Sequence, residues 1–144
     1  MRLNIFIEEN RDEEIIVYAH KESAFTDKIR KLCCEEDTEL IGYNGEIGVR
    51  LKAADVCCFV VEDDRCYAIC HDARYRVKHR LYKLQEILPD DFVKINQSTL
   101  ANTKRITRFD ASISGTLCVE FENGYRDYVS RRNLKEVKKK LEVF

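Results

Sequence analysis

Two adjacent arginines, Arg131 and Arg132, follow a segment that alternates apolar and polar residues around an Asn-Gly pair at 123–124. An Asn-Gly pair between such segments is a strong signal for a tight β-hairpin. Arginine keeps its charge at physiological pH, and its planar guanidinium can bind a phosphate or a guanine edge through two hydrogen bonds. The sequence therefore predicts a hairpin that presents the arginine pair, flanked by Ser130 and Asn133, to a nucleic acid.

A second polar segment, residues 92–106, reads as a strand, a loop and a strand. Its polar side chains are Lys94, Asn96, Gln97, Ser98, Asn102, Lys104 and Arg105. Amide side chains match the donor and acceptor on an adenine edge, whereas serine and lysine suit phosphate. The alternative is a polar loop whose side chains cap the local backbone, and we favour that for Asn102. For Gln97, base contact and local capping both stay open.

The sequence shows no motif for a catalytic site or a metal centre, and a cysteine nucleophile with a distant histidine stays open without any one cysteine standing out. The five glycines form no phosphate-binding loop, the three histidines are scattered, and the aspartate pairs at 63–64 and 90–91 have the character of turn formers. The spacing Cys66-x3-Cys70-His71 comes nearest to a metal pattern, but on a strand residues 66 and 70 face one side and residue 71 the other. We predict no enzyme activity, no metal site, no cofactor and no small-molecule substrate.

The seven cysteines, an odd number, include two adjacent pairs inside apolar segments. In a chain without an export signal, this usage favours reduced thiols in the core over a disulfide framework. A cysteine-based redox or metal sensor stays open as an alternative function.

The charge of the chain is unevenly distributed although its net value is only −1. Residues 1–64 hold 8 basic and 16 acidic residues, a net of −8, and residues 65–144 hold 17 and 10, a net of +7. The split predicts a basic second half suited to a polyanionic partner. The longest strongly apolar run, residues 56–61, is far shorter than the roughly 20 residues that cross a bilayer, and no secretory signal is visible. We expect a soluble, cytoplasmic protein.

Short strands dominate the expected secondary structure. Strands are expected at residues 3–7, 15–19, 47–52, 56–61, 65–70, 74–78, 92–95, 105–109 and 117–121, and helices at 23–34, at 79–88 and from 134 onward. A two-residue hairpin loop would place Glu120 opposite Asp127, which is a repulsive pair. We therefore expect a longer or bulged turn that brings a glutamate opposite Arg126.

These elements predict a mainly β fold of the β-rich α+β class: an elongated array of short antiparallel strands with one internal helix and one C-terminal helix. A small β-β-α extension precedes the array. The charged segment 35–39 ends this extension, so we place the two domains at residues 1–40 and 41–144.

Three segments in order resemble the LytTR family of bacterial DNA-binding domains: VCCFVVEDDRCYAIC, YRVKHRLYKLQEILPDDFVKINQSTLANTKRI and GTLCVEFENGYRDYVSRRNL. The family's pattern is a strand entering a short loop, a Leu-rich helix, and a phenylalanine followed by a basic residue and a polar-Ser-aliphatic-Asn turn. It ends in a strand with Asn-Gly and Val-Ser-Arg. All of these parts are present in order.

The resemblance implies an array of antiparallel strands that binds direct repeats in promoters by laying loops into successive major grooves of double-stranded DNA. By position it implies DNA contacts at Arg65, Cys66, Lys94, Asn96, Gln97, Ser98, Ser130, Arg131, Arg132 and Asn133. We expect Arg132 and Gln97 to read bases. Phosphate contacts are expected mainly from Lys94, Ser98, Ser130 and Arg131. The chain departs from the pattern at residues 65–66, where some members have a histidine, and at 96–97, where many have a basic residue.

About forty residues precede the array, too few for the receiver domain of roughly 100 residues that the best-known members carry. The chain therefore resembles stand-alone members, which are often paired with a small membrane protein. We expect a homodimer, and the acidic extension could serve as a dimer surface, a contact for such a regulator, or an electrostatic guard. A protein–protein interaction module whose basic face binds an acidic partner is the alternative from another class.

Overall fold

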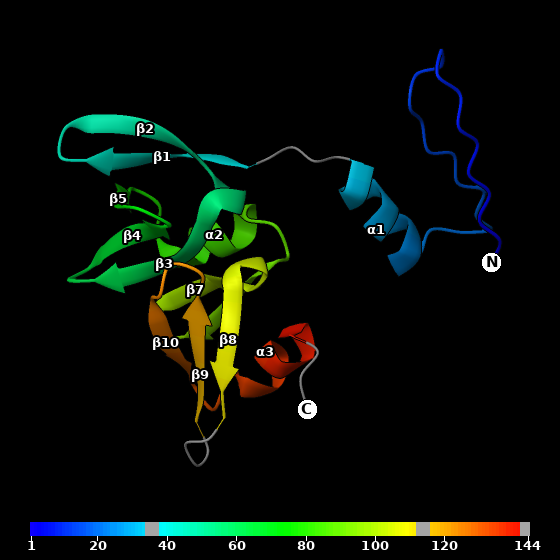
Figure 1. Cartoon of the computed structure of the whole chain (residues 1–144). Coiled ribbons are helices and arrows are strands. Elements are labelled where there is room, and N and C mark those ends of the chain that lie inside the picture. Colours follow the sequence, from blue (N-terminus) through cyan, green and yellow to red (C-terminus); the bar gives the residue numbers. More distant parts are fainter. Residues whose placement is uncertain (34–37, 112–115, 142–144) are drawn as a thin grey trace. The chain divides into compact units, whose positions relative to one another are not determined.

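The computed structural model describes residues 1–33, 38–111 and 116–141 (Figure 1). Contacts within the chain separate it into two units, Met1–Glu36 and Asp37–Phe144. We call these the first unit and the second unit, and we describe each by itself.

The second unit is built on a seven-stranded sheet with the strand order β2-β1-β5-β4-β3-β7-β6. Its strands are β1 (Glu39–Asn44), β2 (Ile47–Lys52), β3 (Val56–Glu62), β4 (Arg65–Cys70), β5 (Arg74–Val77), β6 (Phe92–Asn96) and β7 (Thr99–Asn102). A second sheet, with the order β10-β9-β8, contains β8 (Ile106–Asp110), β9 (Leu117–Phe121) and β10 (Arg126–Val129). The recorded strand pairings are antiparallel. With helices α2 (Leu81–Ile87) and α3 (Leu134–Leu141), the expected β-rich α+β class is confirmed.

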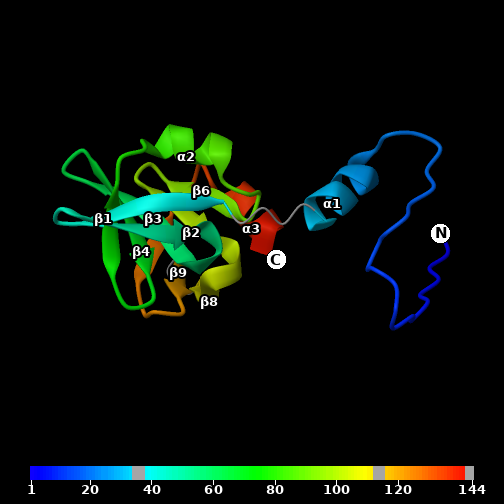
Figure 2. The same cartoon turned by 90° about the horizontal axis from the view of Figure 1, so that it is seen from above.

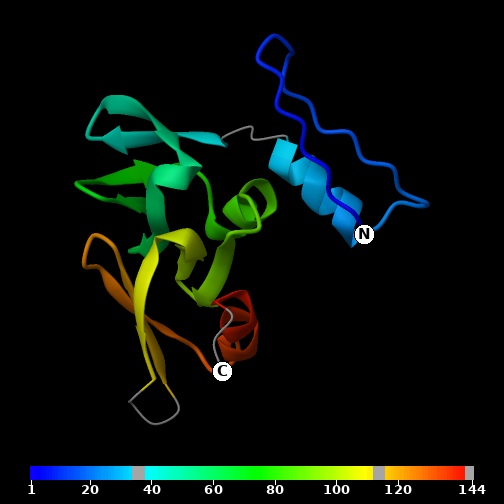
Figure 3. The ribbon, with the colours of Figure 1, turned by 45° about the vertical axis from the view of Figure 1, so that its right-hand side comes forward.

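Strand β3 passes between two hydrophobic clusters, one on each face of the sheet. Phe59 belongs to the cluster that α2 covers with Leu84, and Val60 belongs to the cluster formed with the second sheet and with Val137 of α3. Figure 2 shows α2 on one side of the seven-stranded sheet and β8 and β9 on the other, and α3 packs on β6 (Figure 3). Burial on both faces explains why β3 is an almost continuous apolar run.

The alternation of apolar and polar residues predicted most strands of the second unit, because side chains on the buried face of a strand recur at every second residue. The bounds of β2 and β4 are those expected, and α2 buries Leu81 and Leu84 as the helical spacing predicts. Strands β1 and β7 were not predicted from the sequence, and the residues of β7 were expected to form a polar loop. All four residues of β7 are buried, and the Asn102 side chain donates to the Val56 carbonyl at 3.0 Å and accepts from the Lys104 N–H at 3.1 Å. This confirms its capping role.

The hairpin of β9 and β10 has a bulged turn, as the charge pattern predicts. Glu120 is paired with Arg126, and the repulsive pairing with Asp127 is avoided. The Phe121 N–H donates to the Tyr125 carbonyl and the Gly124 N–H donates to the Phe121 carbonyl, both at 2.9 Å. Gly124 has φ +88°, a left-handed conformation that glycine adopts at little cost.

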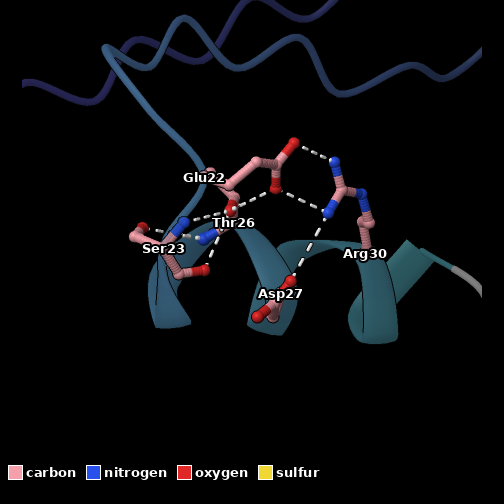
Figure 4. Close-up of polar contacts among 5 residues, drawn as sticks. All are labelled: Glu22, Ser23, Thr26, Asp27 and Arg30. Carbon is pink, nitrogen blue, oxygen red and sulfur yellow. Dashed lines mark hydrogen bonds and ion pairs between the residues drawn. The ribbon is translucent and has the colours of Figure 1, made fainter.

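The first unit contains one helix, α1 (Ala24–Cys33), which begins with a reciprocal cap (Figure 4). Ser23 Oγ accepts from the Thr26 N–H at 3.4 Å, and Thr26 Oγ1 accepts from the Ser23 N–H at 2.9 Å. Such a cap satisfies two backbone donors at the helix start. Arg30 also donates to both carboxylate oxygens of Glu22, at 2.7 and 2.5 Å, which lowers the pKa of Glu22.

The two strands expected in this extension are wrong. Residues 3–7 and 15–19 form no strand, and Leu3 and Ile7 are 81% and 87% exposed. Alternation alone does not stabilise a two-stranded hairpin, which needs a further layer to cover its apolar face. Residue 34 and residues 142–144 of the expected helices lie outside the described residues.

Candidate nucleic-acid interface

Two backbone hydrogen bonds bring together the three regions that the sequence analysis singles out. The Val61 N–H donates to the Ser98 carbonyl at 2.8 Å, which places the β6–β7 turn against the end of β3. Glu62 at that end is paired with Arg65 at the start of β4. The Ser130 N–H donates to the Ile95 carbonyl at 2.8 Å and so places the corner after β10 beside the end of β6.

The three turns therefore follow one another along one edge of the second unit. The side chains of Arg65, Gln97, Ser98, Arg131 and Arg132 are all exposed there. We call the surface formed by these five residues the turn edge. It carries three arginines and one primary amide, groups that bind phosphates and base edges.

Arg65 reaches the turn edge because the β3–β4 connection is very tight. Asp63 and Asp64 have φ +51° and +60°, which matches the two left-handed positions of a two-residue hairpin turn. Aspartate tolerates this conformation better than most residues because its short side chain bonds locally. The prediction that this pair forms a turn is confirmed.

Asn96, which the resemblance implies as a DNA contact, is buried and already hydrogen-bonded within the protein. Its side chain is only 3% exposed. Its Nδ2 donates to Asp127 Oδ1 at 3.1 Å and to the Tyr128 carbonyl at 2.9 Å, while its Oδ1 accepts from the Ser98 N–H at 2.9 Å. The last bond is an Asx turn, a local signal that favours a turn-forming role for asparagine. Asn96 positions the turn that exposes Gln97.

Cys66, another residue that the resemblance implies as a DNA contact, is placed in the core by its position on β4. It is 6% exposed, belongs to the cluster that α2 covers, and is paired with Val61 and Val77. Successive side chains of a strand point to opposite faces, so Cys66 points into the core when Arg65 points to the solvent. The burial of Cys66 could therefore have been predicted from the alternation of residues 65–70 in the sequence.

The corner after β10 is closed by its own polar groups. Asn133 Nδ2 donates to Ser130 Oγ at 2.7 Å, and the Asn133 N–H donates to the Ser130 carbonyl at 3.0 Å. The Asn133 carbonyl then accepts from the Val137 N–H at 3.0 Å in α3. Ser130 and Asn133 are half-buried, and Arg131 and Arg132 between them are exposed. Lys94, in β6, is half-buried.

Sequence reasoning missed the two residues of β7 and β10 that support the β6–β7 turn. Thr99 Oγ1 donates to Asp127 Oδ2 at 2.6 Å, so one aspartate binds both Asn96 and Thr99. We call Asn96, Thr99 and Asp127 the polar anchor. Asp127 is 31 positions from Asn96 and 28 from Thr99 in the chain, and no local pattern marks the pairing.

The buried thiols are poorly suited to redox or metal chemistry. Burial raises the pKa of Cys66 and of Cys70 to about 11, and it also raises the pKa of Cys57 and Cys58. The thiolate is the reactive and metal-binding form, and it is scarce at neutral pH when the pKa is raised. Within residues 1–33, 38–111 and 116–141, no three histidine, cysteine or acidic side chains group as metal ligands.

The helices in the described part of the chain are all too short or too polar to cross a membrane.

Comparisons with known proteins agree with this architecture. A family model described as the LytTr DNA-binding domain matches residues 48–142. An uncharacterized HTH-type transcriptional regulator from Staphylococcus aureus strain N315 is 30% identical over 147 residues, which cover 99% of each chain. A regulator with the same description from strain MSSA476 is 29% identical with the same coverage.

Among solved structures, this chain resembles the LytTr DNA-binding domain of a protein described as a methyl-accepting/DNA response regulator from Bacillus cereus. The TM-score is 0.68 at 19% identity, and the match covers 72% of this chain and 96% of that chain. At this identity the likeness shows the fold alone.

The names of those relatives include the term HTH-type, which stands for helix-turn-helix, but the fold described here does not match that motif. A helix-turn-helix requires two helices joined by a short turn. Among the described elements no two helices are consecutive, since β6 to β10 separate α2 from α3. The three turns of the turn edge are therefore the candidate readers here. Because the family model spans residues 48–142 of a 144-residue chain, the protein belongs to the LytTR family of DNA-binding domains.

Proposed function

We propose that this protein is a sequence-specific transcriptional regulator that binds repeated promoter half-sites in double-stranded DNA with its turn edge. The observation that carries the proposal is the alignment of three separate turns by the Val61–Ser98 and Ser130–Ile95 backbone hydrogen bonds. Family membership supports DNA as the ligand, and the relatives' description as transcriptional regulators supports a regulatory role in the bacterial cytoplasm.

Within the turn edge, Gln97 and Arg132 are proposed to read bases. Both are exposed, and an amide and a guanidinium can each form paired hydrogen bonds with adenine and guanine respectively. Ser98, Ser130, Arg131 and Lys94 are proposed to bind phosphates, which fix the register of the protein on the duplex but carry no sequence information.

The polar anchor supports this division because it holds the β6–β7 turn before DNA arrives. A contact surface that is already ordered loses less conformational entropy on binding. Gln97 is the residue that follows Asn96 directly, so the three hydrogen bonds of Asn96 limit where the Gln97 side chain can reach.

Binding to repeated half-sites calls for two copies, and we propose a homodimer in which the first unit takes part. Its support is the exposure of apolar side chains such as Leu3, Ile7 and Tyr18, which are 81%, 87% and 95% exposed. Replacing Leu3 and Ile7 by aspartate should shift the protein toward monomer in sedimentation velocity. An unchanged sedimentation coefficient would remove the first unit from the dimer. A small membrane protein as regulator stays a prediction that rests on the family resemblance.

The function is tested by fluorescence anisotropy with the full chain and duplexes that tile the DNA upstream of its own gene, with a scrambled duplex of equal length and composition. A specific regulator should bind one duplex at least about 1,000-fold more tightly than the scrambled control. Equal affinity for every duplex with a steep salt dependence would leave a general polyanion binder. Absence of DNA binding would favour the protein–protein interaction module.

A further inference from the structure

A second basic surface adjoins the turn edge, and the functional proposal does not use it. It is an open groove between β4, β5 and the β1–β2 hairpin, lined mainly by Tyr43, Arg65, Tyr67, Arg74, Arg76 and Lys78. We call this surface the basic groove. Arg65 belongs both to the groove and to the turn edge, so the two surfaces are continuous.

Strand register explains why these side chains share one face. Arg76 is paired with Tyr67 on β4 and with Tyr43 on β1, so the three residues lie side by side across three strands. Residues two positions apart on a strand point the same way, which adds Arg65 on β4 and Arg74 on β5 to this face, and Lys78 follows β5 directly. Arg65, Arg74, Arg76 and Lys78 are exposed.

The charge of the groove is strongly positive. Its lining holds four basic residues and a single carboxylate, Glu46. Arg74 is already engaged, since it donates to Glu62 at 2.7 Å and its guanidinium lies 4.2 Å from the centre of the Tyr67 ring. Within the part of the chain that the structure describes, no carboxylate pairs with Arg65, Arg76 or Lys78.

The aromatic rings hold the basic groups in place without neutralising them. Lys78 Nζ lies 4.9 Å from the centre of the Tyr43 ring, a cation–π contact that orients the ammonium group and leaves its charge available. Arg76 and Lys78 are two positions apart, which corresponds to about 6.6 Å along an extended chain. That distance is comparable to the separation of successive phosphates on one DNA strand.

We infer that the basic groove binds the sugar–phosphate backbone of the same duplex, beyond the part of the duplex that lies at Arg65. This inference rests on the proposed function and extends its footprint from the turn edge onto the face of β4 and β5. Arg76 and Lys78 contact phosphates there, and Arg74 stays paired with Glu62, which lies outside the lining of the groove. Because the contacts are to the backbone, the groove strengthens binding to every sequence alike and adds no base preference.

An acidic peptide is the competing occupant, since it would meet the same charges. Continuity with the turn edge favours DNA: a duplex bound at Arg65 brings phosphates to the mouth of the groove without a second partner. The two occupants differ in a measurable way, because only DNA makes the effect of groove substitutions depend on duplex length.

The test measures anisotropy of the full chain with its preferred duplex, in a long form and in two forms shortened by about one helical turn at either end. The variants are Arg76→Ala and Lys78→Ala. Lys52→Ala is the matched control, because Lys52 is exposed and lies at the other end of β2 from the turn that lines the groove. Circular dichroism confirms that each variant is folded.

Each groove variant should bind the long duplex about threefold to tenfold more weakly and make the salt dependence shallower by about 1 in log–log slope. The preference over a scrambled duplex should stay the same, and the effect should vanish when the duplex is shortened at one of its two ends. Lys52→Ala should match the wild type throughout.

Unchanged affinity and salt dependence in both groove variants, with sequence preference intact in the wild type, would overturn the inference and leave the proposed function standing. A changed base preference in Arg76→Ala would also overturn it. A wild-type protein without sequence preference would defeat the proposed function itself, and the inference with it.

Discussion

Asn96 and Asp127, which are 31 positions apart in the chain, are joined by a hydrogen bond of 3.1 Å between Nδ2 and Oδ1. The other oxygen of Asp127 accepts from Thr99 Oγ1 at 2.6 Å. The β6–β7 turn is thereby attached to β10, the strand that leads to Arg131 and Arg132. Two of the three turns of the turn edge are thus coupled by a pair of polar contacts.

Asp127→Ala should therefore loosen the turn edge as well as destabilise the fold. The change removes one of the two acceptors of Asn96 Nδ2 and the acceptor of the Thr99 hydroxyl. A lost partner for partly buried polar groups costs about 1–3 kcal/mol. Urea unfolding should show this loss, and hydrogen exchange should show reduced protection at residues 95–99. A free energy of unfolding equal to that of the wild type in Asp127→Ala would mean that the polar anchor contributes little to stability.

Asn96→Ala and Gln97→Ala should differ sharply although the residues are neighbours. Asn96 is buried with three hydrogen bonds, so its loss should reduce the free energy of unfolding by about 1–3 kcal/mol. Gln97 is exposed, so its loss should leave unfolding within about 0.5 kcal/mol of wild type and alter DNA preference at one base pair. If Gln97→Ala lowered stability and left DNA preference intact, Gln97 would be a structural residue.

Cys66 should resist alkylation in the folded protein and should make stability depend on alkaline pH. Burial raises its pKa from 9.0 to about 11, so the folded state keeps the proton to a higher pH than the unfolded state does. The stability linked to this thiol is complete below pH 9 and is lost as pH rises through 9 toward 11. Urea unfolding at pH 8, 9.5 and 10.5 should therefore show a smaller loss of stability in Cys66→Ala than in wild type. Rapid alkylation of Cys66 at pH 8 would contradict its burial.

Ser23→Ala should shorten or unfold the start of α1. The change removes the acceptor of the Thr26 N–H, and losing such a cap costs about 1 kcal/mol of helix stability. Hydrogen exchange at residues 24–33 should increase, with no change in the second unit. Ser23→Asp retains an acceptor and serves as the control. Equal exchange in all three proteins would show that the cap does not limit the helix.

The helices and strands that could be predicted from sequence alone are those whose apolar residues recur with the period of a strand or a helix. The alternation at 47–52 and 65–70 and the leucines of α2 sufficed because each pattern reports a buried face. Residues 3–7 alternate equally well and form no strand, because pairing and a covering layer decide whether an alternating segment becomes a strand. Residues 99–102 resembled a polar loop because nothing nearby in the sequence indicates a partner for Asn102. In the fold its side chain donates to the carbonyl of Val56, which is 46 positions away.

The candidate site divides in the same way. The exposed arginines and Gln97 follow from local patterns, and so does the burial of Cys66, which the parity of β4 determines. The polar anchor and the basic groove could not be predicted from local patterns. Asp127 and Arg76 lie beside residues of strands that are distant in the sequence. The sequence could propose Asn96 as a DNA contact, and only the fold shows the three hydrogen bonds that its side chain already makes.

The central claim, that the turn edge reads sequence, is tested most directly by comparing Arg132→Ala with Lys94→Ala on the preferred duplex and on a panel of its single-base-pair variants. Arg132→Ala should cost about 1–3 kcal/mol on the preferred duplex and lose discrimination at one position of the panel. Lys94→Ala should weaken every duplex to a similar extent and keep the discrimination. Identical behaviour of the two variants across the panel would contradict the assignment of base reading to Arg132 and of phosphate binding to Lys94.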